Sequence, residues 1–222
     1  SGGLDSSSLV YLAQEIINER GSKESLRTFS AVYDSLEAKD CDESYFIDLL
    51  QAELGFQSFK KEPLGGDIPQ LSELVARHWE TLPDGSGMSG INTIGLAKEI
   101  GLSITIEGQG ADEVQAGYER YLIDHLSSVS WSYLFRNISS YISVWRGSVT
   151  LRQTLFLAFA VRIFGPRLVN LILRRLHKTM LVDGGGLNQA LSNSVGQGLA
   201  NLLHYGDARS MCFSIESRVP FM

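Results

Sequence analysis

Residues able to bind an anion are concentrated at the start of the chain, where two glycines, four serines and one aspartate lie within eight positions. The order is Ser-Gly-Gly-Leu-Asp-Ser-Ser-Ser, and the apolar residues that follow have the spacing of one buried helix face: Leu9, Leu12, Ala13, Ile16 and Ile17. Gly21 is expected to end that helix. A glycine-rich turn ahead of a helix presents unpaired N–H groups, which favours phosphate, and Asp5 could hold a magnesium ion beside it. A flexible start with a serine helix cap is the alternative interpretation.

A second stretch able to do chemistry, residues 107–113, reads Glu-Gly-Gln-Gly-Ala-Asp-Glu and follows a predicted strand. Its glycines permit a close approach of the backbone to a ligand, and its carboxylates suit the N-terminus of the next helix. Taken alone, Asp112 and Glu113 could simply be helix-cap acids. Beside a phosphate-binding turn at the same sheet edge, Asp5 and Asp112 instead predict a magnesium site completed by phosphate oxygens and water.

A third polar stretch closes the chain at residues 207–222 and contains Asp207, Arg209, Glu216 and Arg218. From its residue types alone it is predicted to be an ordinary helix end with internal pairing of aspartate and arginine.

Alternating strands and helices must position these stretches. The first half predicts strands at 28–33, 56–63 and 102–106, and helices at 40–54, 68–80 and 91–100. The helix that Gly55 ends has a predicted buried face of Phe46, Leu49, Leu50 and Leu54. A loop is predicted at 82–92. This alternation predicts an α/β fold with a mostly parallel sheet, which binds ligands at the carboxyl ends of its strands.

The phosphate-binding turn lacks the strand that should precede it, because the chain begins within the turn. The first strand of the sheet is therefore expected upstream of Ser1. On this interpretation the chain is a fragment of a longer protein.

The second half of the chain differs in charge and in predicted structure. Residues 1–124 hold 22 acidic and 9 basic residues, whereas residues 125–222 hold 3 acidic and 10 basic residues. Strand signals stop near Ser127, and helices are predicted at 131–145 and 151–180, with a break at Gly165-Pro166. Two parts are predicted, an α/β part at 1–124 and a helical part at 125–222.

The apolar stretch 151–180 is not predicted to span a membrane, because it is cut into runs of nine residues or fewer, against roughly 20 needed, by Arg152, Arg162, Arg167 and Arg174. Two interpretations of this stretch remain open. It could be a basic amphipathic helix that lies on a membrane or binds an acidic partner, or a packed helix pair with a solvated basic face, and the helix pair is favoured. Two widely separated cysteines favour a reducing, cytoplasmic location. The net charge is −6, no P-loop motif occurs, and no nucleic-acid partner is predicted.

Together the three polar stretches resemble the synthetase domain of glutamine-dependent asparagine synthetases, within the N-type ATP pyrophosphatases. The resemblance is carried by S-G-G-x-D-S-S, by G-Q-G-A-D-E with the following G-Y-x-R-Y, and by S-I-E-S-R-V-P-F-M, with the strand Thr-Phe-Ser between them. It implies an adenine-nucleotide alpha-hydrolase-like fold followed by a helical subdomain. It also implies ATP and Mg²⁺, aspartate activated as β-aspartyl-AMP with release of pyrophosphate, and ammonia from a glutaminase domain of the same protein.

The resemblance also implies roles for individual residues. The residues that it implies for pyrophosphate binding are Ser1, Gly2, Gly3, Asp5 and Ser6. The implied magnesium ligands are Asp5 and Asp112. The resemblance also implies that the adenine lies beside Ala31 and that the AMP moiety lies beside Glu107 and Gly108. A segment near the ammonia passage comprises Arg209, Ser210, Met211 and Glu216.

Departures from the family pattern leave alternatives open. The glutaminase domain with its cysteine nucleophile, the first strand and a downstream lysine are absent, so the fragment alone is expected to be inactive. Gln109 stands where some members carry a glutamate proposed as the base for ammonia, and Glu107 is the hypothetical replacement. A relative acting on another carboxylate, such as a surface-sugar amidotransferase or a ligase closing a β-lactam or peptide, and a non-catalytic nucleotide-binding relative are the alternatives. A homodimer is compatible with the sequence.

Overall fold

The computed structural model describes residues 2–34, 39–63, 73, 85–118, 120–144, 149–175, 182 and 184–222. The chain divides into two compact units, the first made of Ser1–Gln109 with Asn201–Met222 and the second of Gly110–Ala200. The predicted helix at 68–80 lies outside the described residues, except for Glu73. The functional assignment of 1–124 and 125–222 to two parts stays a prediction.

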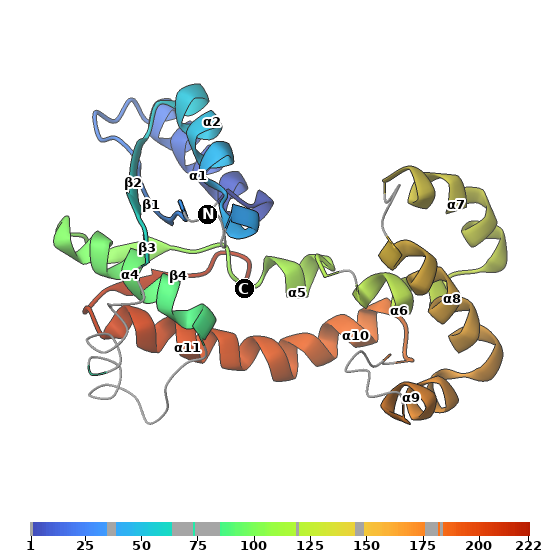
Figure 1. The fold of residues 1–222 in the computed structure, drawn as a ribbon. Helices are drawn as coiled ribbons and strands as arrows, with labels where there is room; N and C mark the ends of the chain where they lie inside the picture. The colour runs from blue at the N-terminus through green and yellow to red at the C-terminus, as the bar shows by residue number, and fades with distance from the viewer. Residues whose placement is uncertain are drawn as a thin grey trace. The chain divides into compact units, whose positions relative to one another are not determined.

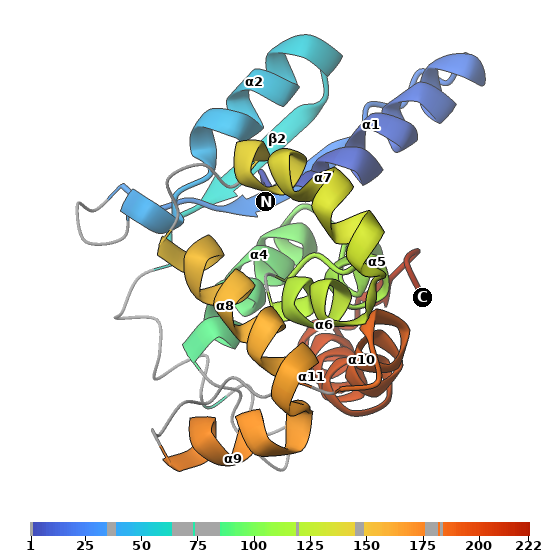
Figure 2. The same cartoon turned by 90° about the vertical axis from the view of Figure 1, so that its right-hand side faces the viewer.

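The first unit is an α/β structure built on parallel strands, as the alternation predicts. Strand β1 (Arg27–Ala31) pairs in parallel with β2 (Gln57–Lys61), and the chain that connects them contains helix α2 (Ser44–Leu54). This strand pair lies between α2 and α4 (Gly85–Glu99) in both views (Figures 1 and 2). A second parallel pair joins β3 (Ile104–Ile106) to β4 (Glu216–Arg218).

The C-terminal segment completes the core of the first unit. Helix α11 (Ala200–Met211) leads into β4, and between them Phe213 and Ile215 pack with Ile94 and Ala97 of α4 and with Phe29 of β1. A β-carbon on Gly95 would lie 3.3 Å from the Phe213 ring, so this glycine gives the ring its place on α4. The prediction that strands end near Ser127 is therefore wrong at β4, whose three residues find a partner strand far away in the sequence only in the folded chain.

Two local predictions are also corrected in the first unit. Residues 85–92, predicted as loop, form the first turns of α4, because glycine and serine are held in the helix by its packing on β1 and β2. Helix α1 (Leu4–Glu19) begins inside the serine-rich stretch rather than after it. Gly55, with φ 73°, ends α2 in the left-handed conformation that glycine favours, as predicted.

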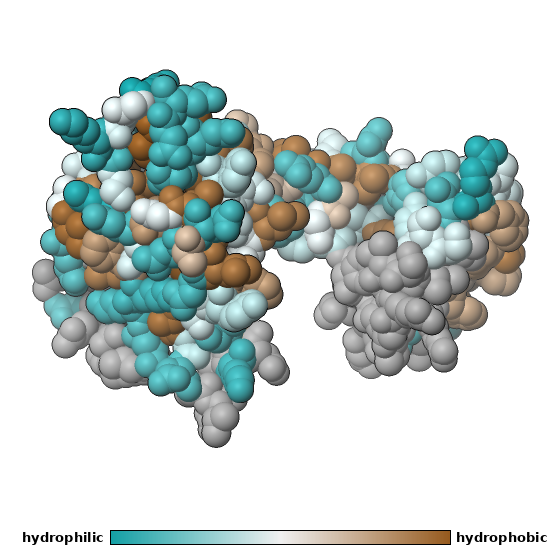
Figure 3. Space-filling model, turned by 90° about the horizontal axis from the view of Figure 1, so that it is seen from above, coloured by the Kyte–Doolittle hydropathy of each residue, from teal (hydrophilic) through white to brown (hydrophobic). Residues whose placement is uncertain are grey.

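The predicted buried faces of α1 and α2 are only partly buried. Leu12 and Ile16 of α1 and Phe46 and Leu49 of α2 are exposed, whereas the buried side chain of α2 is Ile47. Figure 3 shows hydrophobic residues at the surface among hydrophilic ones on the face that it views. Helical spacing identified the helices correctly but not the side that the fold covers.

The second unit is helical over its described residues. Its longer helices are α6 (Arg120–Ser128), α7 (Trp131–Val144), α8 (Val149–Phe164) and α9 (Pro166–Arg175), and shorter ones are α5 (Ala111–Gln115) and α10 (Leu187–Asn193), the latter followed by a π-helical turn, η3 (Ser194–Leu199). The predicted break at Gly165-Pro166 is confirmed, with Gly165 at φ 79°. Buried clusters join Ile123 to α8 and α9, and Leu126 to Leu134 and Ala158. Among the described residues, no helix has the length and apolar character needed to cross a membrane.

Candidate active site

The first turn of α1 contains the residues of the predicted phosphate-binding turn. The Ser7 N–H donates to the Gly3 carbonyl at 3.0 Å, so the helix starts immediately after the two glycines. Two serine hydroxyls donate to backbone carbonyls of the same turn. Ser6 Oγ donates to the Gly3 carbonyl at 3.1 Å, and Ser8 Oγ donates to the Leu4 carbonyl at 2.7 Å. The N-terminus of α1 is thus formed by this glycine–aspartate–serine segment. Asp5 lies in this first turn.

Glu43, at the start of α2, holds the beginning of this turn. The Gly2 N–H donates to Glu43 Oε2 at 2.8 Å. A β-carbon on Gly2 would lie 2.8 Å from the Glu43 carbonyl oxygen and 2.9 Å from the Phe46 Cβ, so only glycine fits. This carboxylate was not predicted as a site residue, and the sequence showed it only as an acidic residue at a helix start.

The second polar stretch meets the first at Gly108. A β-carbon on Gly108 would lie 3.1 Å from the Ser6 backbone nitrogen and 3.3 Å from the Asp5 Cβ. The backbone of Glu107 is fixed at the end of β3, where its N–H donates to the Arg218 carbonyl of β4 at 2.8 Å. The carboxyl end of β3 and the N-terminus of α1 are therefore in contact, as the parallel-sheet argument predicts.

The Glu107 carboxylate has a partner on each oxygen. Ser217 Oγ of β4 donates to Oε1 at 2.8 Å, and Arg209 Nη2 of α11 donates to Oε2 at 3.3 Å. The side chains of the ion pair are mostly buried, with 22% of Glu107 and 17% of Arg209 exposed. Each oxygen keeps a second lone pair, so these contacts do not decide the hypothesis that Glu107 accepts a proton from ammonia, which stays a prediction.

Arg209 reaches Glu107 across the surface of α4 at Gly90. A β-carbon on Gly90 would collide with Arg209 Nη1 and lie 2.8 Å from its Cζ, so any larger residue would displace the guanidinium. Arg209 Nε is buried and has no hydrogen-bond partner among the described residues. On the same helix as Arg209, a β-carbon on Gly206 would lie 3.0 Å from Gln109 Oε1. Two glycines thus make room for the contacts of α11 with α4 and with residues 107–109.

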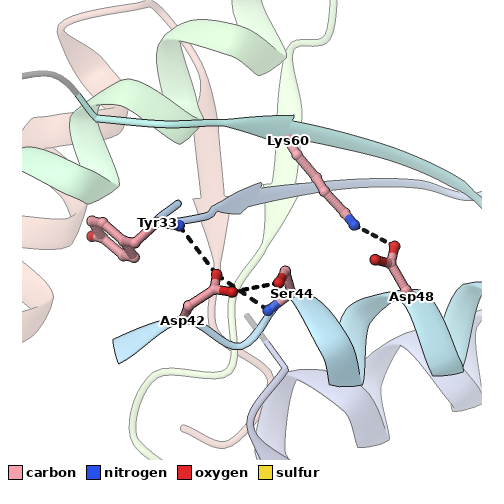
Figure 4. Close-up of polar contacts among 5 residues, drawn as sticks. All are labelled: Tyr33, Asp42, Ser44, Asp48 and Lys60. Carbon is pink, nitrogen blue, oxygen red and sulfur yellow. Dashed lines mark hydrogen bonds and ion pairs between the residues drawn. The ribbon is translucent and has the colours of Figure 1, made fainter. Parts of the chain in front are cut away.

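A cluster of polar contacts ties the carboxyl end of β1, where Ala31 lies, to the start of α2 (Figure 4). Asp42 Oδ1 accepts the Tyr33 N–H at 3.1 Å and the Ser44 N–H at 3.4 Å, and Asp42 Oδ2 accepts the Ser44 hydroxyl. These hydrogen bonds, that of the Ser44 hydroxyl first, lower the pKa of Asp42 below its usual value of 3.8. Lys60 of β2 pairs with Asp48 of α2 nearby.

In the second unit, α5 carries Asp112 and Glu113 in its first turn after Gly110, whose φ is 96°. Glu113 is buried and accepts the Tyr118 hydroxyl at 2.6 Å. Burial, and then this hydrogen bond, raise the pKa of Tyr118. The Arg120 guanidinium lies 5.1 Å from the Tyr118 ring centroid and 4.9 Å from that of Tyr121, and it donates to Ser194 Oγ at 2.9 Å. Both tyrosines of this block therefore pack against the Arg120 guanidinium.

The structure brings together several, but not all, of the predicted site residues. Asp5, Ser6, Glu107 and Gly108 meet in the first unit, and Ser1 lies outside the described residues. The predicted magnesium site divides between the units, Asp5 in the first and Asp112 in the second, and stays a prediction. Carboxylate oxygens suit Mg²⁺, which takes one or two protein carboxylates with phosphate and water. No group of three or more metal-binding side chains occurs among the residues that the structure describes.

The family model described as asparagine synthase matches residues 1–222, the whole chain. The chain belongs to the asparagine synthase family. No curated protein matches the sequence. The parallel α/β architecture is consistent with this membership, which supports an ATP-dependent, ligase-type amidation in general terms.

Proposed function

We propose that the protein activates a carboxylate with ATP as an acyl-AMP and transfers ammonia to it, with aspartate as the substrate and asparagine as the product. A substrate carboxylate oxygen attacks the α-phosphorus, and the bond from that phosphorus to the bridging oxygen breaks, releasing pyrophosphate. Ammonia then attacks the acyl carbon, and AMP leaves. The ammonia would come from glutamine, hydrolysed by a glutaminase domain of the same protein.

The observation that carries this proposal is the contact between Gly108 and the first turn of α1 at Ser6. It supports a site in which the turn that contains Gly2, Gly3 and Ser6 binds pyrophosphate while the backbone at Glu107 and Gly108 lies beside the adenylate. Ala31, at the carboxyl end of β1, would lie beside the adenine. Asp5 and Asp112 would hold Mg²⁺, which when bound supplies charge neutralisation at the phosphates.

Gln109 favours one second candidate within the same chemistry, a relative that amidates or cyclises another carboxylate. An amide cannot accept the proton that some family members are proposed to transfer to a glutamate at this position.

The two described cysteines, Cys41 and Cys212, are free thiols, which supports a reducing, cytoplasmic location.

The test is magnesium-dependent exchange of labelled pyrophosphate into ATP by the full-length protein, with a panel of carboxylic acids. Stimulation by aspartate alone supports the proposal, and stimulation by another acid supports the second candidate. An absence of exchange with every acid would favour a non-catalytic nucleotide-binding protein. Asp5→Asn should abolish the exchange while leaving thermal unfolding nearly unchanged, because Asp5 lies in the first turn of α1 and is assigned a ligand role.

A further inference from the structure

We infer that Arg209 is a positioning residue that neutralises the Glu107 carboxylate beside the phosphate-binding turn and fixes residues 107–109 against α1. The inference deepens the proposed function and rests on it for the identity of the anion, pyrophosphate. It assigns to Glu107 the role of an anchored carboxylate rather than that of a base for ammonia.

The Glu107 charge lies close to the anion site. Gly108, the next residue, contacts the Ser6 backbone nitrogen, since a β-carbon there would lie 3.1 Å from it. Consecutive Cα atoms are about 3.8 Å apart, so Glu107 lies within the roughly 8 Å over which physiological salt screens charges. An uncompensated carboxylate at this place would repel pyrophosphate from the N-terminus of α1.

Arg209 compensates this charge from α11. It donates to Glu107 Oε2 at 3.3 Å, and the pair is mostly shielded from solvent. Its guanidinium occupies the space over Gly90, where even a methyl group would collide with Nη1. A guanidinium in so confined a place, with its Nε buried and unpartnered among the described residues, is held there chiefly by the carboxylate.

Glu107 is fixed both at its backbone and at its side chain. The Glu107 N–H donates to the Arg218 carbonyl at 2.8 Å, and its Oε1 accepts Ser217 Oγ at 2.8 Å. With Arg209 on Oε2, the carboxylate is tied to α11 and to β4 at once. The position of Gly108 against Ser6 follows from this anchoring, because Gly108 is the next residue in the chain.

The experiment measures pyrophosphate and MgATP binding to the full-length protein by calorimetry, together with the exchange reaction. Arg209→Met should weaken pyrophosphate binding and raise the KM for MgATP by about tenfold or more, because it leaves a shielded charge unpaired. Arg209→Lys, which retains the charge, should recover most of the loss. Glu107→Gln keeps an amide oxygen that can accept from Arg209 and an amide N–H that can donate to the Ser217 hydroxyl, but it removes the negative charge, so it should tighten pyrophosphate binding.

The two single substitutions should have opposite effects on pyrophosphate binding. If the ion pair were merely structural, replacing either Arg209 or Glu107 would weaken that binding. The double variant Arg209→Met with Glu107→Gln should bind pyrophosphate better than Arg209→Met alone. Lys60→Met, which breaks the Lys60–Asp48 pair of the same unit, is the matched control and should change neither readout.

The inference is overturned if Arg209→Met binds pyrophosphate as the wild type does, or if Glu107→Gln weakens binding as much as Arg209→Met. If Arg209→Met does not fold, the comparison of Arg209→Lys and Glu107→Gln with the wild type decides the matter in the same way. Failure of the proposed function is a separate result, because it would appear as a wild-type protein that performs no exchange at all.

Discussion

Gly108 lies so close to Ser6 that a β-carbon on the glycine would stand 3.1 Å from the serine backbone nitrogen. This contact joins two motifs that lie far apart in the sequence. It places the carboxyl end of β3 against the N-terminus of α1, where a helix leaves N–H groups for an anion.

Gly108→Ala should therefore damage the anion site more than the fold. The added methyl group pushes the first turn of α1 away by a few tenths of an ångström, at a cost of about 1–3 kcal/mol of unfolding free energy. Pyrophosphate exchange should fall by roughly tenfold or more, because the N–H groups move away from their ligand. Gly196→Ala, where nothing lies within 4 Å of the added carbon, is the control and should retain full exchange. Equal activities of the two variants would contradict a site at this contact.

Glu43 should compete with a bound anion for the Gly2 N–H, because it accepts this N–H in a hydrogen bond of 2.8 Å. Glu43→Ala should lower the unfolding free energy by about 1 kcal/mol, the usual net value of one such bond. The same substitution should tighten pyrophosphate binding by roughly fivefold, because it frees the N–H and removes a nearby negative charge. Urea unfolding and calorimetric binding measure the two effects. Glu19→Gln, an exposed change at the C-terminal end of α1, should alter neither, and weaker pyrophosphate binding by Glu43→Ala would contradict the competition.

Asp42 should make the first unit sensitive to acid. Its hydrogen bonds from the Ser44 hydroxyl and the Tyr33 N–H lower its folded-state pKa below 3.8, so the unfolded chain binds the proton more readily. The stabilisation is complete above about pH 4 and is lost as the pH falls through the folded-state pKa. Asp42→Asn should remove this part of the acid dependence, measured as the slope of unfolding free energy against pH. A slope identical to that of the wild type would show that these bonds do not persist in solution.

His125 should make the second unit less stable in mild acid. Burial lowers the pKa of its ring below 6.5, and its Nε2 lies 2.9 Å from the Tyr141 hydroxyl. Because the unfolded chain takes up the proton first, stability is complete above about pH 6.5 and declines as the pH falls through the folded-state pKa. NMR titration of the His125 ring measures that pKa directly. His125→Phe should flatten the pH dependence in the range from about pH 7.5 to about pH 5, and an NMR-derived pKa at or above 6.5 would contradict the assignment.

The predicted elements differ from the observed ones where tertiary packing overrides local pattern. Helical spacing identified α1 and α2, but Leu12 and Phe46 lie on exposed faces, since spacing reports an apolar side and not what covers it. The glycine- and serine-rich residues 85–92 read as a loop because their helix propensity is low, and packing on β1 and β2 makes them helical. The three-residue strand β4 carries too little local signal to be predicted, and its pairing with β3 defines it.

The sequence by itself determined the parallel α/β class, the helical character of residues 131–144 and 151–175 and the three motifs, because periodicity and turn chemistry are local properties. It also predicted that Asp5, Glu107 and Gly108 belong to one site, and the structure brings Gly108 close to Asp5. Only the tertiary structure decided that Glu43 holds Gly2, that Ser217 and Arg209 hold Glu107, and that Gly90 makes room for the guanidinium. Those contacts join residues 41 to 119 positions apart, and a pairing at such separation is decided by how the packed elements meet, which no local pattern of residues records.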